Sequence, residues 1–168
     1  GVGTYTKQTF SKDRYKLWYM QSQWHNCPTI NGIQQQEGRR FMAKGVSFRD
    51  NGSTRVLSMD IAAAYPTTAM VKRWQRTFTF SPAAMRLQLQ EDYELTAWKE
   101  PYQLHFMTAL PADTHIPGKI ILQGAGNLLE MSYDAALFEV AADEQAIDDK
   151  RLLPVWGNHV TRISLKAK

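Results

Sequence analysis

Hydrophobic and polar residues alternate along several stretches of this chain. Over residues 86–95 the even positions are all polar, and the odd positions are hydrophobic apart from Glu91. Over residues 71–80 three aromatic side chains share one face of the alternation, which Arg76 interrupts. A period of two residues is that of a half-buried β-strand. Because a Ser-Pro break separates the two stretches, they are predicted to form an antiparallel hairpin.

Turn signals divide the rest of the chain into short strands. The sequence Asp50-Asn51-Gly52 predicts a tight turn between strands at residues 41–48 and 55–61. Helix is expected only as single turns near residues 11–14 and 60–64. Further strands are expected at residues 103–110, 119–123, 128–133, 137–141 and 159–166. Many short strands without crossover helices predict an all-β fold, an antiparallel two-sheet β-sandwich with little helix.

Length and composition agree with one such domain over residues 1–168. No hydrophobic run approaches the roughly 18 residues of a membrane helix, so no membrane partner is expected. The net charge is +4, but the basic residues are scattered, so no nucleic-acid partner is expected.

The single cysteine excludes an internal disulfide and leaves the compartment open. Because the first residue is glycine rather than methionine, we expect the chain to begin inside a longer protein.

Candidate chemistry is concentrated in the stretch WYMQSQWHNCPTINGIQQQEG, residues 18–38. It places His25-Asn26 between aromatic residues and a predicted turn at Asn31-Gly32. An imidazole followed by a carboxamide can present a metal ligand or a pair that contacts sugars. No second His, Cys or acid stands at a zinc-ligand spacing from His25. From spacing alone, the plainer interpretation is therefore a histidine bonded to the backbone at a strand end.

Residues near this pair have the side chains that sugars require. Tyr5, Tyr15 and Trp24 could stack on the apolar faces of pyranose rings. Gln21, Asn26 and Gln35 could form hydrogen bonds with hydroxyl or carboxylate groups. The alternatives stay open, because aromatic residues of all-β chains often belong to the core and an Asn often caps a turn.

A series of short motifs along nearly the whole chain resembles a known family. The motifs are Gly3-Thr4-Tyr5, Arg14-Tyr15, Ser22-x-x-His25-Asn26, Ile30-Asn31-Gly32 with Gln35, Asp60-Ile61-Ala62-Ala63-Ala64-Tyr65-Pro66, Lys72-x-Trp74-x-Arg76, Asp92-Tyr93-Glu94-Leu95 and Val155-Trp156-Gly157. Together they are similar to the C-terminal β-sandwich of the heparinase II/III-like polysaccharide lyases. The His-Asn motif is the specific part of this resemblance.

The resemblance implies a supersandwich-like domain of a bacterial enzyme. Such enzymes cleave acidic, uronic-acid-containing polysaccharides such as glycosaminoglycans by β-elimination. It further implies that His25 is one ligand of a zinc ion whose other ligands belong to earlier strands outside this chain. Because the catalytic residues would lie in those strands and in an N-terminal helical toroid domain, this chain alone is expected to be inactive. A periplasmic or secreted location is implied, and a cytoplasmic one stays open.

The predicted β-sandwich also allows a non-catalytic role and exposes strand edges. The alternative to a lyase domain is a non-catalytic carbohydrate-binding or scaffold β-sandwich module, which has the same fold. A sandwich without some of its strands also exposes strand edges, and such edges pair readily with other chains. We therefore expect the isolated chain to self-associate through exposed edges.

Overall fold

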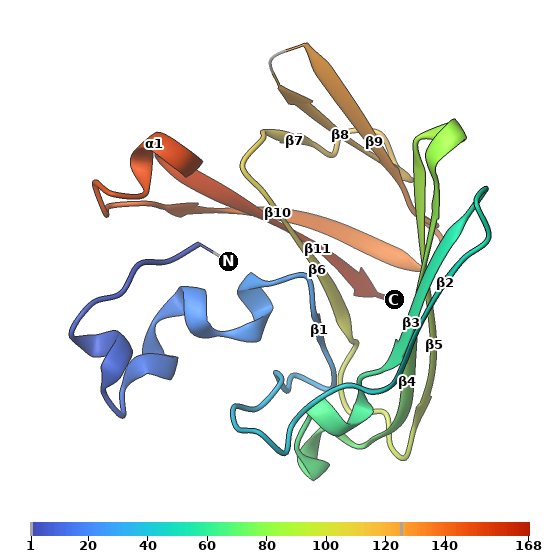
Figure 1. Cartoon of the computed structure of the whole chain (residues 1–168), viewed down its shortest axis with the longest axis horizontal. Helices are drawn as coiled ribbons and strands as arrows, with labels where there is room; N and C mark the ends of the chain where they lie inside the picture. The colour runs from blue at the N-terminus through green and yellow to red at the C-terminus, as the bar shows by residue number, and fades with distance from the viewer. Residues whose placement is uncertain (1, 125) are drawn as a thin grey trace. The chain divides into compact units, whose positions relative to one another are not determined.

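The computed structural model describes residues 2–124 and 126–168 and has an all-β fold (Figure 1). Strands hold 46% of the residues and short helical turns 15%, which confirms the predicted antiparallel, sandwich-like class with little helix. The strands form three hydrogen-bonded sheets rather than two. Two compact units result, one from Gly1–Thr29 with Pro101–Lys168 and the other from Ile30–Glu100. Whether residues 1–168 act as one domain stays a prediction.

The first unit is built on a four-stranded antiparallel sheet. Its strands, in spatial order, are β1 (Pro28–Thr29), β6 (Gln103–Thr108), β11 (His159–Ala167) and β10 (Phe138–Ala146). Strand β11 lies between β6 and β10, and its Val160 and Ile163 are almost fully buried. Strand β10 runs five residues beyond the predicted end at residue 141, because residues 142–146 continue the ladder with β11.

A smaller sheet in the same unit has the order β7 (Ala112–Asp113), β8 (Lys119–Gly124) and β9 (Asn127–Ser132). Strands β8 and β9 were both predicted from the sequence. The turn between them contains Gly126 at φ +81°, a backbone conformation that glycine adopts without steric cost. One short helix, α1 (Leu153–Trp156), precedes β11. Within the described part of the chain, no helix is long and apolar enough to cross a membrane.

The N-terminal segment of the first unit contains four 3₁₀ turns. They are η1 (Gln8–Phe10), η2 (Arg14–Lys16), η3 (Trp18–Met20) and η4 (Ser22–Trp24), drawn in blue in Figure 1. Each turn ends at a residue with extended backbone, so no longer helix propagates. Val2 belongs to a buried cluster with Val160 of β11, and Trp18 and Met107 of β6 pack against this cluster. The segment thereby covers one face of the four-stranded sheet.

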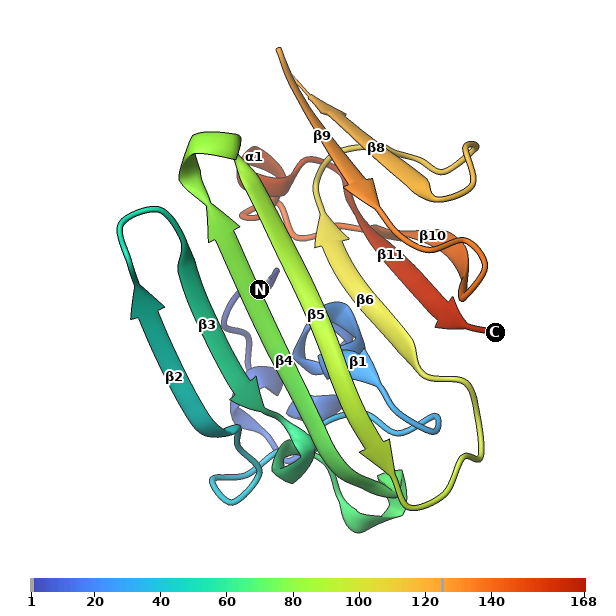
Figure 2. The ribbon, with the colours of Figure 1, turned by 90° about the vertical axis from the view of Figure 1, so that its right-hand side faces the viewer.

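The second unit is a four-stranded antiparallel meander (Figure 2). Its strands are β2 (Lys44–Asp50), β3 (Arg55–Asp60), β4 (Val71–Ser81) and β5 (Arg86–Leu95). The bounds of β5 are those predicted, and β4 is one residue longer. Strand β2 starts three residues later than predicted and continues to the turn at Asn51-Gly52. The 3₁₀ turns η5 (Ala62–Ala64), η6 (Thr67–Ala69) and η7 (Pro82–Ala84) join the strands.

The turn predicted at Asn31-Gly32 is present. Ile30 and Ile33 exchange two main-chain hydrogen bonds of 3.0 and 2.9 Å across it. Both central residues have positive φ, 51° at Asn31 and 74° at Gly32, as a type I′ turn requires. An Asn-Gly pair adopts this conformation readily, so the local sequence determines the turn.

Candidate functional site

His25 follows η4 in extended backbone, and its ring is half-buried. Its Nε2 lies 3.0 Å from the main-chain oxygen of Tyr19. Because a carbonyl oxygen only accepts, Nε2 donates in this bond, and in the neutral ring the lone pair is then on Nδ1. Nδ1 has no hydrogen-bond partner in residues 2–124 and 126–168. One nitrogen held by a carbonyl and the other open is how a metal-binding histidine is oriented.

The same bond also matches the plainer interpretation of a histidine bonded to the backbone. Among the described residues, no group of three or more His, Cys, Asp or Glu side chains is placed to hold a metal ion. A structural zinc site needs four ligands and a catalytic one three protein ligands. His25 therefore fits a zinc ion only as one ligand of a site completed by other polypeptide.

The Asn26 side chain is exposed and ties the N-terminal segment to the sheet. Its Oδ1 accepts a hydrogen bond of 2.9 Å from the main-chain N–H of Met107 on β6. The sequence suggested either a contact with substrate or a cap on the following turn. The observed bond reaches a strand 81 residues away. It fixes the backbone next to His25, so Asn26 helps to position the imidazole.

Trp24 stacks on a cation. The guanidinium carbon of Arg162 lies 4.3 Å from the centroid of the Trp24 ring, and Trp18 contacts the same ring edge-on at 5.2 Å. Arg162 also donates to Gln23 Oε1 at 3.1 Å and to Asp143 Oδ2 at 3.0 Å. One face of the indole is thus covered by Arg162. A sugar could stack only on the opposite face.

Tyr15 and Gln21 lie beside one another near the surface. The Arg14 guanidinium lies 5.2 Å above the Tyr15 ring, which remains partly exposed. Gln21 Nε2 donates to the main-chain oxygen of Tyr15 at 3.4 Å, and Gln21 Oε1 accepts from Gln23 at 2.9 Å. Gln21 therefore links η2 to η4, and the Tyr15 ring carries a neighbouring positive charge.

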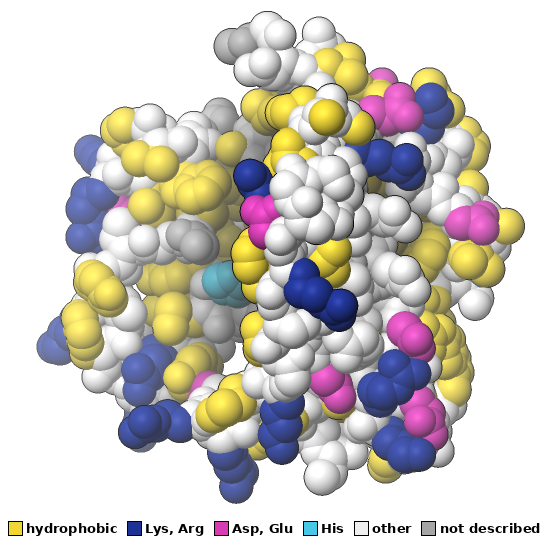
Figure 3. Space-filling model, turned by 45° about the vertical axis from the view of Figure 1, so that its right-hand side comes forward, with side chains coloured by type: hydrophobic (Ala, Val, Ile, Leu, Met, Phe, Trp, Pro, Cys, Tyr) yellow, Lys and Arg dark blue, Asp and Glu magenta, His cyan; other side chains and the backbone are white. Residues whose placement is uncertain are grey.

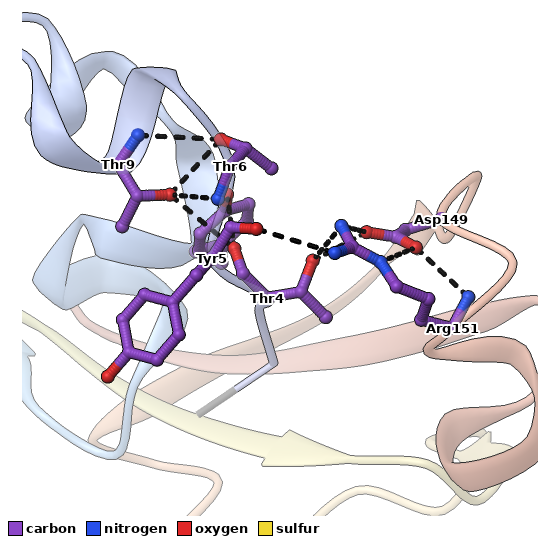
Figure 4. Close-up of polar contacts among 7 residues, drawn as sticks. Thr4, Tyr5, Thr6, Thr9, Asp149 and Arg151 are labelled. Carbon is purple, nitrogen blue, oxygen red and sulfur yellow. Dashed lines mark hydrogen bonds and ion pairs between the residues drawn. The ribbon is translucent and has the colours of Figure 1, made fainter.

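Tyr5 belongs to a hydrogen-bonded network that fastens the N-terminal segment to the loop before α1 (Figure 4). Its main-chain oxygen accepts from Arg151 Nη1 at 3.4 Å. Arg151 Nη2 also contacts Thr4 Oγ1 and Asp149 Oδ2, each at 2.6 Å, and Thr4 Oγ1 donates to Asp149 Oδ2 at 2.5 Å. Hydrogen bonds from Arg151 and Thr4 hold the pKa of the Asp149 carboxyl well below its usual range. These bonds therefore favour the ionised form of the Asp149 carboxyl.

The predicted site residues fall into both units. Tyr5, Tyr15, Gln21, Trp24, His25 and Asn26 all lie on the N-terminal segment of the first unit, whereas Gln35 belongs to the second unit. Within the first unit, Gln21 contacts Tyr15, and Tyr19 contacts both His25 and the main-chain oxygen of Thr4. Six of the seven residues therefore lie on one segment, in which these bonds link Gln21 to Tyr15 and His25 to Tyr19.

Sequence reasoning missed the environment of His105. This residue is 3% exposed, with Nε2 2.9 Å from Thr29 Oγ1 and Nδ1 2.9 Å from Ser164 Oγ. Burial, with the nearby Arg162 charge, lowers the pKa of His105 to about 4. Its partners are 76 and 59 residues away along the chain, so no local motif could reveal them. The buried ring ties β1, β6 and β11 together.

On the face drawn in Figure 3, the positive charges do not form one broad patch. In Figure 3 the Lys and Arg side chains, in dark blue, are scattered among hydrophobic and acidic ones over the face shown.

No model of a known protein family matches the chain, and no curated protein sequence matches it either. The likeness to the heparinase II/III-like lyases therefore rests on the short motifs quoted above.

Proposed function

We propose that this chain is the C-terminal β-sandwich of a heparinase II/III-like polysaccharide lyase and forms one wall of its substrate cleft. The observation that supports this is the His25 ring. It is half-buried rather than enclosed, the Tyr19 carbonyl fixes its tautomer, and its Nδ1 is open. A histidine presented in this way is suited to complete a site made by a second part of the protein.

The proposed reaction is β-elimination on a uronic-acid-containing polysaccharide. A base removes the proton from the carbon beside the carboxylate, a double bond forms to the next carbon, and the bond to the glycosidic oxygen breaks. An acid then gives a proton to the departing oxygen. The reaction requires the substrate carboxylate to be neutralised while base and acid are held within hydrogen-bond reach. The base and the acid would come from the upstream toroid and strands, with no catalytic residue in this chain.

The contribution of this chain is to bind and orient the substrate. His25 would hold a zinc ion together with residues of the upstream strands, and a bound zinc ion would add positive charge to the wall of the cleft. Asn26 holds the backbone beside His25, through its bond to Met107. Tyr5 and Tyr15 are exposed enough to contact sugar rings. A periplasmic or secreted location would give such an enzyme access to acidic polysaccharides.

The experiment uses the protein translated from its complete reading frame. Zinc content is measured by elemental analysis, and lyase activity is measured from the ultraviolet absorbance of the unsaturated product formed from several uronic-acid polysaccharides. His25→Ala should lose zinc and activity. His115→Ala is the matched control, because the His115 side chain is 94% exposed in the loop before β8 and should matter to neither.

Two results would contradict the proposal in different ways. Unchanged zinc content in His25→Ala would remove the ligand assignment. Absence of any unsaturated product from the wild-type protein would remove the lyase and favour the alternative, a non-catalytic carbohydrate-binding or scaffold module.

A further inference from the structure

Tyr5 and Phe10 form an exposed pair of stacked rings. Their centroids are 5.5 Å apart, the ring planes differ by 25°, and each residue is 77% exposed. Single exposed aromatic residues are common, but two stacked rings at the surface form an apolar patch of defined shape. The pair contributes little to the core, because most of its area remains in water.

The loop that carries the rings is closed by hydrogen bonds, as Figure 4 shows. Thr6 N donates to Thr9 Oγ1 at 3.0 Å, and Thr9 N donates to the main-chain oxygen of Thr6 at 3.1 Å. The two hydroxyl groups are 3.1 Å apart, and the Thr9 side chain is buried. These bonds bring residues 5 and 10 side by side. The rings are therefore held in place before any ligand arrives, which reduces the entropy lost on binding.

A second set of bonds anchors the loop to the body of the unit. Thr4 is held by Asp149 and Arg151, and Arg151 also donates to the main-chain oxygen of Tyr5. The Arg151 guanidinium thus lies beside the backbone that presents the Tyr5 ring. Because Asp149 neutralises it, Arg151 acts here as an anchor rather than as a free positive charge.

Most of the net charge of the chain lies on the same segment. Residues 7–16 contain Lys7, Lys12, Arg14 and Lys16 against the single acid Asp13, a net charge of +3 from four positive charges and one negative. The whole chain has a net charge of +4. All four basic residues are exposed, and only Lys16 forms an ion pair within the described residues, with Asp13 at 2.7 Å. Lys7 thus lies between the two stacked residues in sequence, and the other three basic residues follow Phe10.

We propose that the Tyr5–Phe10 pair is a binding platform for acidic polysaccharides. The apolar face of a pyranose ring would stack on the exposed aromatic surface, and Lys7, Lys12 and Arg14 would pair with carboxylate or sulfate groups of the same polymer. The charge identifies this occupant, because a second copy of the chain would bring an equally basic segment and be repelled. The platform uses none of the contacts of His25, and it binds polymer whether or not the protein is a lyase.

The experiment measures binding of the whole chain to polygalacturonate, to heparin and to dextran by titration calorimetry at low and high salt. Tyr5→Ala and Phe10→Ala should each weaken binding to the acidic polymers about fivefold. Phe48→Ala is the matched control, because Phe48 is 63% exposed on β2 of the other unit and should leave binding unchanged. Thermal unfolding should change little in all three variants, since each ring is mostly in water.

The charges are tested by a triple variant, Lys7→Gln, Lys12→Gln and Arg14→Gln. Binding should weaken about tenfold at low salt, and the difference should shrink at high salt. The control removes three charges elsewhere, by Arg39→Gln, Arg40→Gln and Lys44→Gln. It is closely matched, because Arg40 lies over the Phe41 ring at 4.7 Å as Arg14 lies over Tyr15 at 5.2 Å.

Three outcomes would overturn the proposal that the Tyr5–Phe10 pair binds acidic polysaccharides. They are unchanged binding in Tyr5→Ala and Phe10→Ala, equal weakening by the two triple variants, and equally strong binding of neutral dextran. Stronger binding of heparin than of polygalacturonate would identify sulfate as the preferred anion, and the reverse would identify the carboxylate. Binding by the platform is judged from Tyr5→Ala and Phe10→Ala alone, whereas loss of zinc or of lyase activity in His25→Ala bears on the lyase proposal and not on the platform.

Discussion

Arg76 on β4 and Glu91 on β5 stand directly opposite each other and form a buried ion pair. Arg76 Nε lies 2.7 Å from Glu91 Oε1, and their side chains are only 6% and 8% exposed. Trp74 Nε1 donates to the other carboxylate oxygen at 2.8 Å. Burial raises the pKa of Glu91, although Arg76 and Trp74 act in the opposite direction. Arg76 and Glu91, the charged residues that interrupt the hydrophobic faces of residues 71–80 and 86–95, therefore pair with each other.

Removing one member of this pair should strongly destabilise the second unit. Arg76→Met leaves the Glu91 carboxylate buried without its partner, and the free energy of unfolding should fall by about 3–5 kcal/mol. The double variant Arg76→Met with Glu91→Leu should be less destabilised than Arg76→Met alone, because no unpaired charge remains. Urea unfolding of the two single variants and the double variant measures the coupling.

Lys72→Met is the control, since the exposed Lys72–Glu94 pair should contribute less than about 1 kcal/mol. Additive effects of Arg76→Met and Glu91→Leu would contradict the coupling.

The buried His105 should make the fold sensitive to mild acid. Its pKa is lowered to about 4 in the folded chain from 6.5 in the unfolded chain, chiefly by burial. Between these two pH values the unfolded state binds more protons than the folded state. The contribution of neutral His105 to the free energy of unfolding is therefore complete above pH 6.5 and is lost as the pH falls to 4. The expected loss is about 3 kcal/mol in the free energy of unfolding. Urea unfolding at pH 7, 5.5 and 4 checks it.

His105→Gln separates this effect from the carboxylates that also titrate in acid. The glutamine variant should be less stable at pH 7 but should lose much less stability between pH 6.5 and 4. Parallel curves for the variant and the wild type would show that another group is responsible.

Asn31 should be one of the most sensitive positions of the second unit. Its Nδ2 donates to the carbonyls of Ala69 and Ala97 at 2.8 and 2.9 Å, and its Oδ1 accepts from the main-chain N–H groups of Lys99 and Glu100 at 2.8 and 3.2 Å. Asn31→Ala leaves four main-chain groups without these partners. We expect a loss of about 3 kcal/mol or more in the free energy of unfolding, measured by urea unfolding.

Two further substitutions test this explanation of Asn31. Asn31→Asp keeps the acceptor but places an oxygen against two carbonyls, so it should be almost as damaging. Asn51→Ala should cost about 1 kcal/mol or less, because Asn51 makes its bonds in an exposed turn. Similar losses for Asn31→Ala and Asn51→Ala would show that a turn effect alone accounts for both.

The isolated chain is expected to self-associate through an exposed edge. All seven residues of the edge strand β2 are exposed, including Val46 and Phe48. Unpaired main-chain groups beside apolar side chains favour pairing with another chain. Sedimentation velocity should therefore show concentration-dependent association, and Val46→Lys should reduce it. A clean monomer at all concentrations would contradict this prediction.

Local sequence was sufficient to place most strands and turns. The alternation over residues 86–95 marks β5, and Asn31-Gly32 marks a type I′ turn, because both signals depend only on neighbouring residues. The same reasoning predicted one helical turn near residues 11–14, where η2 begins, but not the other 3₁₀ turns of the N-terminal segment. That segment has neither a period of two nor one of 3.6, and its conformation depends on packing against β6 and β11.

The sequence by itself determined the all-β class, the strand positions, the chemical character of residues 18–38 and the basic charge of residues 7–16. Only the tertiary structure decided that Glu91 faces Arg76, that His105 lies between Thr29 and Ser164, that Phe10 stacks on Tyr5, and that Gln35 belongs to a different unit from His25. The physical reason is the range of the interactions. Alternation and turn conformation are properties of adjacent residues. Pairing of buried polar groups depends instead on strand register and on which segment covers a sheet. Strand register and sheet coverage leave no local pattern in the chain.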